Sequence, residues 1–456
     1  MTSGTGSETL FKIWQGFCRL ICRVFYRKVE VLGNIPQVET GGVIVCANHV
    51  NALVDPVVVQ AATSRKLRPL ARSGLFHSPF APILKAIGAV PIFRRGDPGV
   101  NTSQNLDSFS KCYELLAQNE ALIIFPEGQS HGDPHLHQLK TGAARMALGA
   151  ISVNKQVTVI PAGLTFGSKR RFRSRVLVNF GSAIDLSVGD SLAPREKINL
   201  ITQRISSGLT AVTLNAGTWE EIDLVNRLER FFSIRHGKYH ARSLSQRFKA
   251  LQRLIDGQKL LQVHEPRRVR ALVSKLKAFE NLRKCLGIQD YHLTIHYKPL
   301  LIISYLLRTA GILIFVLPIA LIGVVNSFIP WYITSRMAPR FAKGPDQMDT
   351  ARILVGSVAF LGFWSLQSFG VYLYGGLGPA LIYLLIVVIC SCIAVFMRSE
   401  LKRIYDNIRV FFLFLRKREI KGFVQHKRQE LEQELASLVR IAKRLSAQET
   451  HSHESQ

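Results

Sequence analysis

The feature that most constrains this chain is a set of three long apolar runs near its C-terminal end. They occupy residues 300–333, 353–374 and 379–397. About 20 apolar residues are enough for a helix to cross a bilayer, so the sequence predicts a helical membrane block over 300–397. The segment YGGLGP between the second and third runs predicts a tight turn, and therefore a helical hairpin. Aromatic side chains lie near the ends of the runs, where interfacial anchors belong: Trp331, Tyr332, Tyr372 and Tyr374.

The first apolar run is longer than one span requires, and it contains Arg308 and Pro318. These features favour a re-entrant or two-part hairpin that leaves the membrane on the side where it entered. The basic tail that begins at Arg398 is expected on the cytoplasmic side, because basic flanks stay inside. The N-terminal half is expected there too, and so is the basic loop 334–352.

The net charge of +28 calls for a polyanionic neighbour. Anionic membrane is favoured over nucleic acid because the chain itself enters a membrane, and because the basic helices at 227–284 carry few aromatic residues for stacking on bases. We therefore expect membrane lipids, and no nucleic acid, as partners. The seven cysteines are scattered without a C-x-x-C pair, which favours reduced thiols over a zinc ribbon or a disulfide framework.

The N-terminal half alternates strand-like and helix-like runs, which is typical of an α/β fold with a largely buried mixed sheet flanked by helices. Strands are expected at 42–47, 67–72, 87–93, 121–125, 157–166 and 174–181. The predicted organisation has five parts: an amphipathic membrane-associated helix (1–29), an α/β domain (30–215), a basic helical linker (216–299), the transmembrane helical block (300–397) and a basic helical tail (398–456).

One stretch of the α/β domain, CANHVNALVDP, places His49 directly after an apolar strand and Asp55 six positions later. Functional groups of α/β domains gather at the carboxyl ends of strands, so the two side chains are candidates for a catalytic pair. Asp55 also precedes a proline that suits the first turn of a helix. Helix capping is therefore an alternative role for this carboxylate.

Three further stretches contain candidate site residues. GAVPIFRRGD places Arg94 and Arg95 after a strand, and guanidinium groups match phosphate oxygens. IIFPEGQSHGD leaves a strand through Glu127 and Gly128, and a glycine lets backbone amides approach a ligand. The histidines that follow fit no common zinc spacing, so no metal is expected. VTVIPAGLTF contains a proline, which marks a strand edge or a bulge.

The order of these blocks resembles the glycerolipid acyltransferase superfamily, which includes glycerol-3-phosphate and 1-acylglycerol-3-phosphate acyltransferases. Its four blocks correspond here to NHVNALVD, VPIFRRGD, FPEGQSH and VIPAG, and LKTGAARMA also resembles the family. Most members separate the histidine and the aspartate by four residues, whereas five separate them here. HVNALVDP and FPEGQSH look like the fungal-type glycerol-3-phosphate/dihydroxyacetone-phosphate acyltransferase subgroup.

The resemblance implies an enzyme of phospholipid biosynthesis that moves an acyl group from acyl-CoA or acyl carrier protein to glycerol-3-phosphate or 1-acylglycerol-3-phosphate. A histidine is a natural base near neutral pH, so His49 would activate the acceptor hydroxyl while Asp55 orients its ring. No cofactor is needed. The acceptor is expected to contact Arg94, Arg95, Glu127, Gly128 and Ser130, and the acyl chain Ile160 and Pro161.

The alternatives left open are a dihydroxyacetone-phosphate acyltransferase, a CoA-independent lysophospholipid transacylase and a non-catalytic membrane lipid-binding protein. The intact His49, Asp55 and Glu127 count against the last of these. The expected location is a bacterial inner membrane or an endoplasmic reticulum, with the catalytic domain on the cytoplasmic side.

Overall fold

The structure, a computed structural model, divides into two compact units. The first contains Met1–Ile222, Arg242–Gln252 and Ala342–Thr350, and the second contains Asp223–Ala241, Arg253–Phe341 and Ala351–Gln456. The structure describes residues 3–35, 41–78, 81–93, 105–153, 156–167, 173–235, 243–289, 292–293, 299–342, 344 and 346–454.

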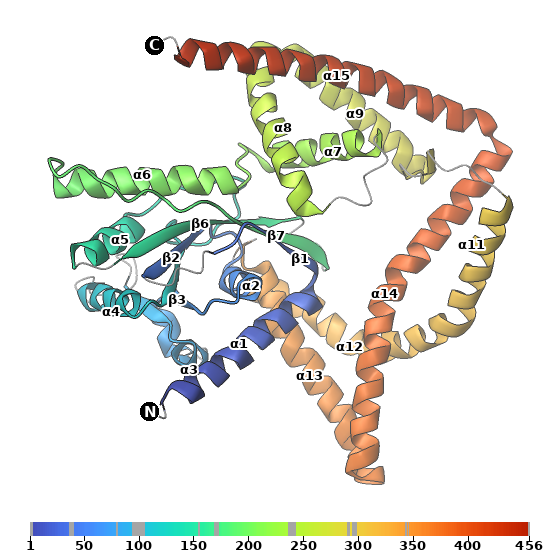
Figure 1. Ribbon diagram of the computed structural model, residues 1–456. Coiled ribbons are helices and arrows are strands. Elements are labelled where there is room, and N and C mark those ends of the chain that lie inside the picture. Colours follow the sequence, from blue (N-terminus) through green and yellow to red (C-terminus); the bar gives the residue numbers. More distant parts are fainter. Residues whose placement is uncertain are drawn as a thin grey trace. The chain divides into compact units, whose positions relative to one another are not determined.

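The first unit is built on a seven-stranded mixed sheet with the order β1-β7-β6-β2-β5-β3-β4 (Figure 1). Neighbouring strands pair in parallel except β6 and β7, which are antiparallel. The strands are β1 (Tyr26–Leu32), β2 (Gly42–Ala47), β3 (Leu67–Arg72), β4 (Val90–Ile92), β5 (Ala121–Ile124), β6 (Val157–Phe166) and β7 (Ser174–Phe180). The mixed sheet with flanking helices confirms the predicted fold class.

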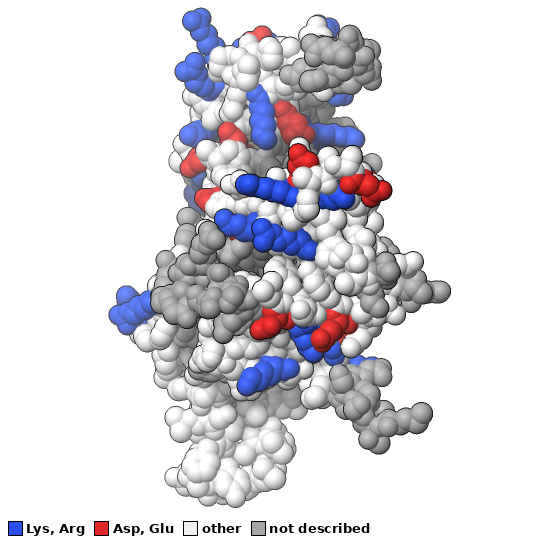
Figure 2. Space-filling view, turned by 90° about the vertical axis from the view of Figure 1, so that its left-hand side faces the viewer, with Lys and Arg blue, Asp and Glu red and all other residues white. Residues whose placement is uncertain are grey.

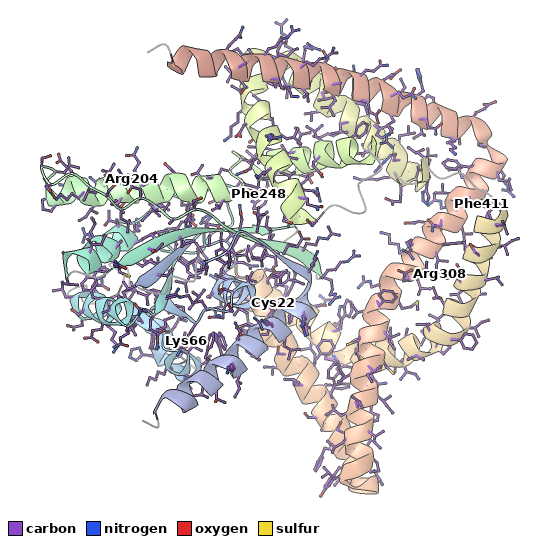
Figure 3. All side chains as sticks on the ribbon, in the orientation of Figure 1. Cys22, Lys66, Arg204, Phe248, Arg308 and Phe411 are labelled. Atoms are coloured by element: carbon purple, nitrogen blue, oxygen red, sulfur yellow. The ribbon has the colours of Figure 1, made fainter. Side chains whose placement is uncertain are left out.

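The sheet is buried because its central strands have apolar side chains on both faces. All six residues of β2 are buried, and this strand lies between β5 and β6. One face packs on three helices in a core cluster that includes Ile44, Leu116, Met146 and Ile205. The helices of this unit are α2 (Val54–Ala62), α3 (Ala81–Ala86), α4 (Asn105–Ala117), α5 (Gly142–Ser152) and α6 (Pro194–Val212), with a 3₁₀ turn η1 (Ser73–His77). Phe248, from a later segment, packs on Leu177 of β7 (Figure 3).

The N-terminal helix α1 (Ser3–Phe25) ends earlier than the sequence predicts. Residues 26–29, which the sequence assigns to the helix, open β1 instead and pair with β7. The inner face of α1 buries Cys18 and Cys22, and α1 packs against α2. The rest of the apolar stripe is exposed, with Leu10, Ile13, Phe17, Leu20 and Val24 each about half accessible or more. The helix is therefore amphipathic, with its larger apolar face open.

The proline of β6 does not mark a sheet edge, because β6 is an interior strand. It does lie where the antiparallel register shifts by one residue, between the pair Ala162–Phe180 and the bridge Val159–Ile184, as a bulge would. Pro161 is opposite Cys46 in the ladder with β2, and its carbonyl accepts a hydrogen bond from the amide of Gly181. Pairing with β7 begins only at Ala162. The proline therefore lies where the β7 ladder has not yet begun, so its missing N–H removes no ladder hydrogen bond.

The second unit is helical throughout the part that the structure describes. Its helices are α7 (Trp219–Arg235), α8 (Leu244–His264), α9 (Pro266–Leu286), α11 (Pro299–Gly311), α12 (Leu317–Phe341), α13 (Met348–Gly375), α14 (Leu377–Arg416) and α15 (Arg418–Glu454); α7, α8 and α13 begin in segments assigned to the first unit. Among the described residues, three stretches are long and apolar enough to cross a membrane: Ile302–Phe341, Met348–Gly375 and Leu377–Arg416. They agree with the three apolar runs of the sequence.

The first candidate span is interrupted by a π-helical turn, η3 (Ile312–Val316), between α11 and α12. The chain changes direction there (Figure 1), close to the Arg308 and Pro318 of the predicted hairpin. Inside the block, Asn326 accepts hydrogen bonds from Gln367 and Tyr383, so one amide ties three helices together. The tip of the α13–α14 hairpin carries no charge and is white at the bottom of Figure 2.

Candidate active site

The site begins where β2 ends, at His49. The ring Nδ1 of His49 lies 2.9 Å from Asp55 Oδ2, and this carboxylate is fully buried whereas the histidine side chain is 15% exposed. Because a carboxylate only accepts hydrogen bonds, Nδ1 carries the proton and donates it. The lone pair is then on Nε2. The ring also stacks on Phe125, with 4.2 Å between ring centroids. His49 is thus held by the Asp55 carboxylate, which bonds its Nδ1, and by the Phe125 ring, which stacks on the face of the imidazole.

The carboxylate of Asp55 does not cap its helix, so the capping interpretation is wrong. Asp55 is inside the first turn of α2, and no side chain caps that helix. Its Oδ2 instead accepts hydrogen bonds from the backbone amides of Val50 (2.8 Å) and Asn51 (2.7 Å). The loop can turn back because Ala52 adopts a left-handed conformation with φ of 42°, which is uncommon for a residue with a side chain. This turn accommodates five intervening residues while the pair stays in contact.

Glu127 links the loop after β5 to the loop that contains His49. Its Oε1 accepts a hydrogen bond from the amide of His49 (2.7 Å), and its Oε2 from the amide of His137 (2.8 Å) and from the ring of His131. The amide of His131 in turn donates to the carbonyl of His49 (3.1 Å). The side chain of Glu127 is fully buried. Its two oxygens therefore fix the backbone on both sides of the site.

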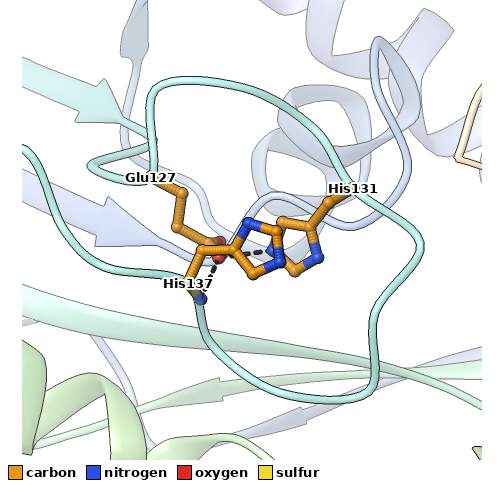
Figure 4. A group of neighbouring side chains, drawn as sticks. All are labelled: Glu127, His131 and His137. Carbon is orange, nitrogen blue, oxygen red and sulfur yellow. Dashed lines mark hydrogen bonds and ion pairs between the residues drawn. The ribbon is translucent and has the colours of Figure 1, made fainter.

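Glu127, His131 and His137 also form a candidate metal-binding set, whose ligand atoms lie within 4.8 Å of one another (Figure 4). The rings of His131 and His137 stack nearly parallel, with 3.7 Å between ring centroids and 7° between ring planes. The in-plane lone pairs of stacked rings do not converge on one point, and His131 Nε2 is already hydrogen-bonded to Glu127. Asp133 accepts from the outer ring, that of His137 (2.7 Å), and this hydrogen bond lowers the pKa of the Asp133 carboxyl. This arrangement is a hydrogen-bonded support for the loop, in which the ring nitrogens do not face a common ion.

Two acidic residues near the junction of α12 and α13 reach the same loops, Asp346 before α13 and Asp349 in its first turn, and neither belongs to a sequence motif. The hydroxyl of Ser130 donates to Asp346 Oδ2 (2.5 Å), and the side-chain amide of Asn51 donates to Asp349 Oδ2 (3.0 Å). Asp346 is 8% exposed. Burial, followed by the negative charges of Asp349 and Asp55, raises the pKa of Tyr26 at the start of β1. Asp346 and Asp349 are the only acidic residues between Asp290 and Glu400, which is a signal that could have identified them.

The remaining candidate residues are placed as follows. Arg94 and Arg95 lie outside the described residues. Gly128 has a φ of 80°, which favours glycine, and its amide donates to the carbonyl of Phe125. Ile160 is fully buried in the sheet, and the ring of Pro161 faces Gly181 and Gly208. The structure thus brings His49, Asp55, Glu127 and Ser130 together, while the acyl-chain contacts of the β6 residues stay a prediction.

The comparisons with known proteins agree with the motifs of this site. Residues 27–165 match the family described as Acyltransferase. A glycerol-3-phosphate O-acyltransferase of Saccharomyces cerevisiae is 32% identical over 28% of this chain and 18% of its own length. A chloroplastic 1-acyl-sn-glycerol-3-phosphate acyltransferase of Arabidopsis thaliana is 29% identical over 27% of this chain and 33% of its own length.

Among solved structures, the 1-acyl-sn-glycerophosphate acyltransferase of Thermotoga maritima aligns with a TM-score of 0.34 and 17% identity, covering 46% of this chain and 83% of that one. The chain matches less than a fifth of the yeast relative and a third of the plant relative. The sequence similarity therefore concerns the domain that contains the site.

Proposed function

We propose that the chain is a membrane-bound O-acyltransferase of the glycerolipid acyltransferase superfamily, which its matches to the Acyltransferase family over residues 27–165 and to the yeast and plant acyltransferases support. In this proposal the acyl group passes from an acyl thioester to a hydroxyl of glycerol-3-phosphate or 1-acylglycerol-3-phosphate. The observation that carries the proposal is the oriented pair of His49 Nδ1 and Asp55 Oδ2, 2.9 Å apart, which leaves Nε2 with the lone pair. That arrangement is what an alcohol nucleophile requires from a general base.

The reaction follows from this geometry. His49 Nε2 takes the proton of the acceptor hydroxyl as its oxygen attacks the thioester carbonyl carbon. The tetrahedral intermediate then collapses, the carbon–sulfur bond breaks, and the imidazolium returns the proton to the leaving thiolate. The buried Asp55 carboxylate stabilises the imidazolium while it exists, and holds the ring in the tautomer that starts the reaction. The acyl group passes directly to the acceptor, so the enzyme forms no acyl intermediate.

Glu127 has a supporting role in this proposal. Its oxygens accept hydrogen bonds from the amide of His49 and from the ring of His131. The general base and the loop that contains Ser130 and His131 therefore keep a fixed separation during the reaction. Arg94 and Arg95 supply the phosphate contact, because guanidinium groups bind phosphate oxygens with two parallel hydrogen bonds. Ile160 and Pro161 contact the acyl chain in this proposal.

The membrane supplies or receives the lipid substrates. The exposed apolar stripe of α1, together with its basic residues Lys12, Arg19 and Arg23, suits a helix lying on an anionic membrane surface. The three candidate spans anchor the chain, and the acyltransferase domain faces the cytoplasm, where thioester donors are made. A non-catalytic lipid-binding protein would have no use for a buried carboxylate aimed at a histidine ring.

An acyl-transfer assay tests this function. Purified protein in detergent is supplied with labelled acyl-CoA or acyl carrier protein, and with glycerol-3-phosphate, 1-acylglycerol-3-phosphate and dihydroxyacetone phosphate in turn. Label recovered in an oxygen ester of a glycerol phosphate supports the proposal. Transfer from a phospholipid donor with none from either thioester would identify a transacylase, and the absence of any transfer would contradict the enzyme assignment.

A further inference from the structure

The junction of α12 and α13, including the first turn of α13, belongs to the acyltransferase site. Residues 342–350 fall within the first compact unit although apolar helices flank them in the chain. Asp346 and Asp349 hold this segment against two different loops, one through Ser130 and one through Asn51. The Ser130 loop adjoins His49, because the amide of the next residue, His131, donates to the carbonyl of His49 (3.1 Å). The loop of Ser130 is therefore fixed beside the loop of His49.

The contact with Asp346 decides what Ser130 can do for a ligand. A serine hydroxyl has one donor hydrogen and two acceptor lone pairs. The hydrogen points at Asp346 Oδ2, 2.5 Å away, and a carboxylate that is largely buried is a strong acceptor. Only the lone pairs of Ser130 stay available, so Ser130 accepts a hydrogen bond and does not donate one. A phosphate at this position would find no donor in the Ser130 side chain and would meet the negative charge of Asp346.

We propose that Ser130 and Asp346 form a hydroxyl-binding pair that makes this site selective for glycerol-3-phosphate. The inference rests on the proposed function and names its acceptor. Ser130 accepts the hydrogen bond of the hydroxyl that does not react, and Asp346 is a positioning residue that keeps the serine in its accepting orientation. The phosphate group of the acceptor is directed away from this pair.

The three candidate acceptors differ in whether a second hydroxyl is free to donate a hydrogen bond to Ser130. Glycerol-3-phosphate has two hydroxyl groups, so one can react at His49 while the other donates to Ser130. Dihydroxyacetone phosphate has a ketone in place of its second hydroxyl, and a ketone cannot donate. In 1-acylglycerol-3-phosphate the single free hydroxyl is the one that reacts. A site built to pair with a hydroxyl discriminates strongly against analogues that lack it, because the polar group of the protein is left without its partner.

The test compares acceptor preference in the full-length protein in detergent, as kcat and KM for glycerol-3-phosphate and for dihydroxyacetone phosphate. Ser130→Ala is expected to lower kcat/KM for glycerol-3-phosphate by roughly 10- to 100-fold, mainly through KM because the bond exists before reaction. The value for dihydroxyacetone phosphate should stay within about threefold. Asp346→Ala should likewise lower the ratio of kcat/KM for glycerol-3-phosphate to kcat/KM for dihydroxyacetone phosphate. Without the carboxylate, the hydroxyl of Ser130 can turn and donate to a ketone or a phosphate.

Two controls separate this role from a general loss of structure. Asp346→Asn keeps an amide oxygen that accepts from Ser130, so it should restore most of the preference lost in Asp346→Ala. Ser187→Ala removes a similar but exposed serine–aspartate hydrogen bond, that of Ser187 to Asp185 (2.6 Å), and should leave the preference unchanged.

The outcomes distinguish this inference from the function on which it rests. A wild-type protein that prefers dihydroxyacetone phosphate or 1-acylglycerol-3-phosphate would overturn the inference alone. So would a Ser130→Ala variant that loses activity equally toward glycerol-3-phosphate and dihydroxyacetone phosphate. A wild-type protein that acylates none of the three acceptors would overturn the proposed function, and the inference with it.

Discussion

Replacing Asp55 with asparagine tests whether the buried carboxylate serves the histidine or only shapes the loop. Asp55 Oδ2 accepts three N–H groups, from the ring of His49 and the amides of Val50 and Asn51, at 2.7–2.9 Å. An asparagine can place its oxygen at the same point but without the charge. Since charge-assisted hydrogen bonds are roughly twice as strong as neutral ones, each bond should weaken by about 1 kcal/mol. The loss over three bonds is about 3 kcal/mol.

The same substitution has a second cost on the other oxygen. Asp55 Oδ1 is buried and has no hydrogen-bond partner in the described part of the chain, so the NH₂ group of an asparagine would be left unpaired there. The three weakened bonds alone should lower the thermal midpoint of the domain by about 6–12 °C, at roughly 2–4 °C for each kcal/mol in a domain of this size, and the unpaired NH₂ group should lower it further. We expect kcat to fall by roughly 10²–10⁴-fold, because the imidazolium also loses its counter-charge.

The assay is acyl transfer to glycerol-3-phosphate at a temperature below the midpoint of the variant, alongside thermal unfolding in the same detergent. Asp185→Asn is the matched control, because Asp185 accepts two hydrogen bonds from Ser187 at an exposed site. The reasoning is refuted if Asp55→Asn lowers the midpoint as expected but reduces kcat by less than about tenfold. The carboxylate would then be a structural group of the loop.

Ala52, the buried Cys46 and the membrane block offer three further tests. Ala52→Gly should leave activity unchanged and the unfolding free energy within about 1 kcal/mol, since glycine tolerates the left-handed φ, whereas Ala52→Val should lower both; detergent unfolding and kcat measure this. Burial raises the pKa of the Cys46 thiol to about 12. A maleimide at pH 7 should therefore modify the exposed Cys285 and leave Cys46 and the activity intact. Rapid inactivation with label on Cys46 would contradict this prediction. Because Asp346 and Asp349 contact the loops of the site, the α12–α13 junction should lie on the catalytic side of the membrane and the tip of the α13–α14 hairpin on the opposite side. Single cysteines in a cysteine-free protein should therefore be labelled from the catalytic side at Arg340 and from the opposite side at Tyr374. Labelling of both from one side would disprove this topology.

Local sequence predicts the strands of the sheet well where a short β-branched run is bounded by turn residues. The predicted bounds of β2, β3 and β6 match those of the structure. The sequence misses β1 because the apolar pattern of α1 continues through Phe25, and Arg27 falls on the basic face of the same predicted helix. Only the parallel pairing with β7, about 150 positions later in the chain, makes Tyr26–Leu32 a strand. That pairing is a tertiary contact without a local signal.

The candidate site also contains residues with a local sequence signal and residues without one. His49, Asp55 and Glu127 are found from motifs, and the structure joins them through hydrogen bonds. The capping role of Asp55 was wrong because the left-handed Ala52 turns the carboxylate away from its own helix. Asp346 and Asp349 could not be found from a motif, since they come from a segment more than 200 residues after the site loops. Their isolation in a long stretch without other acidic residues is the signal that marks them in retrospect.

The central claim is that His49 is the general base of an acyl transfer, and the direct test is the rate of that transfer with the base removed. Initial rates are measured for wild type and His49→Ala with labelled acyl-CoA and saturating glycerol-3-phosphate, after matching thermal midpoints confirm that both are folded. We predict a fall in kcat of roughly 10²–10⁴-fold, the usual contribution of general base catalysis. A folded His49→Ala protein with near wild-type kcat would contradict the mechanism.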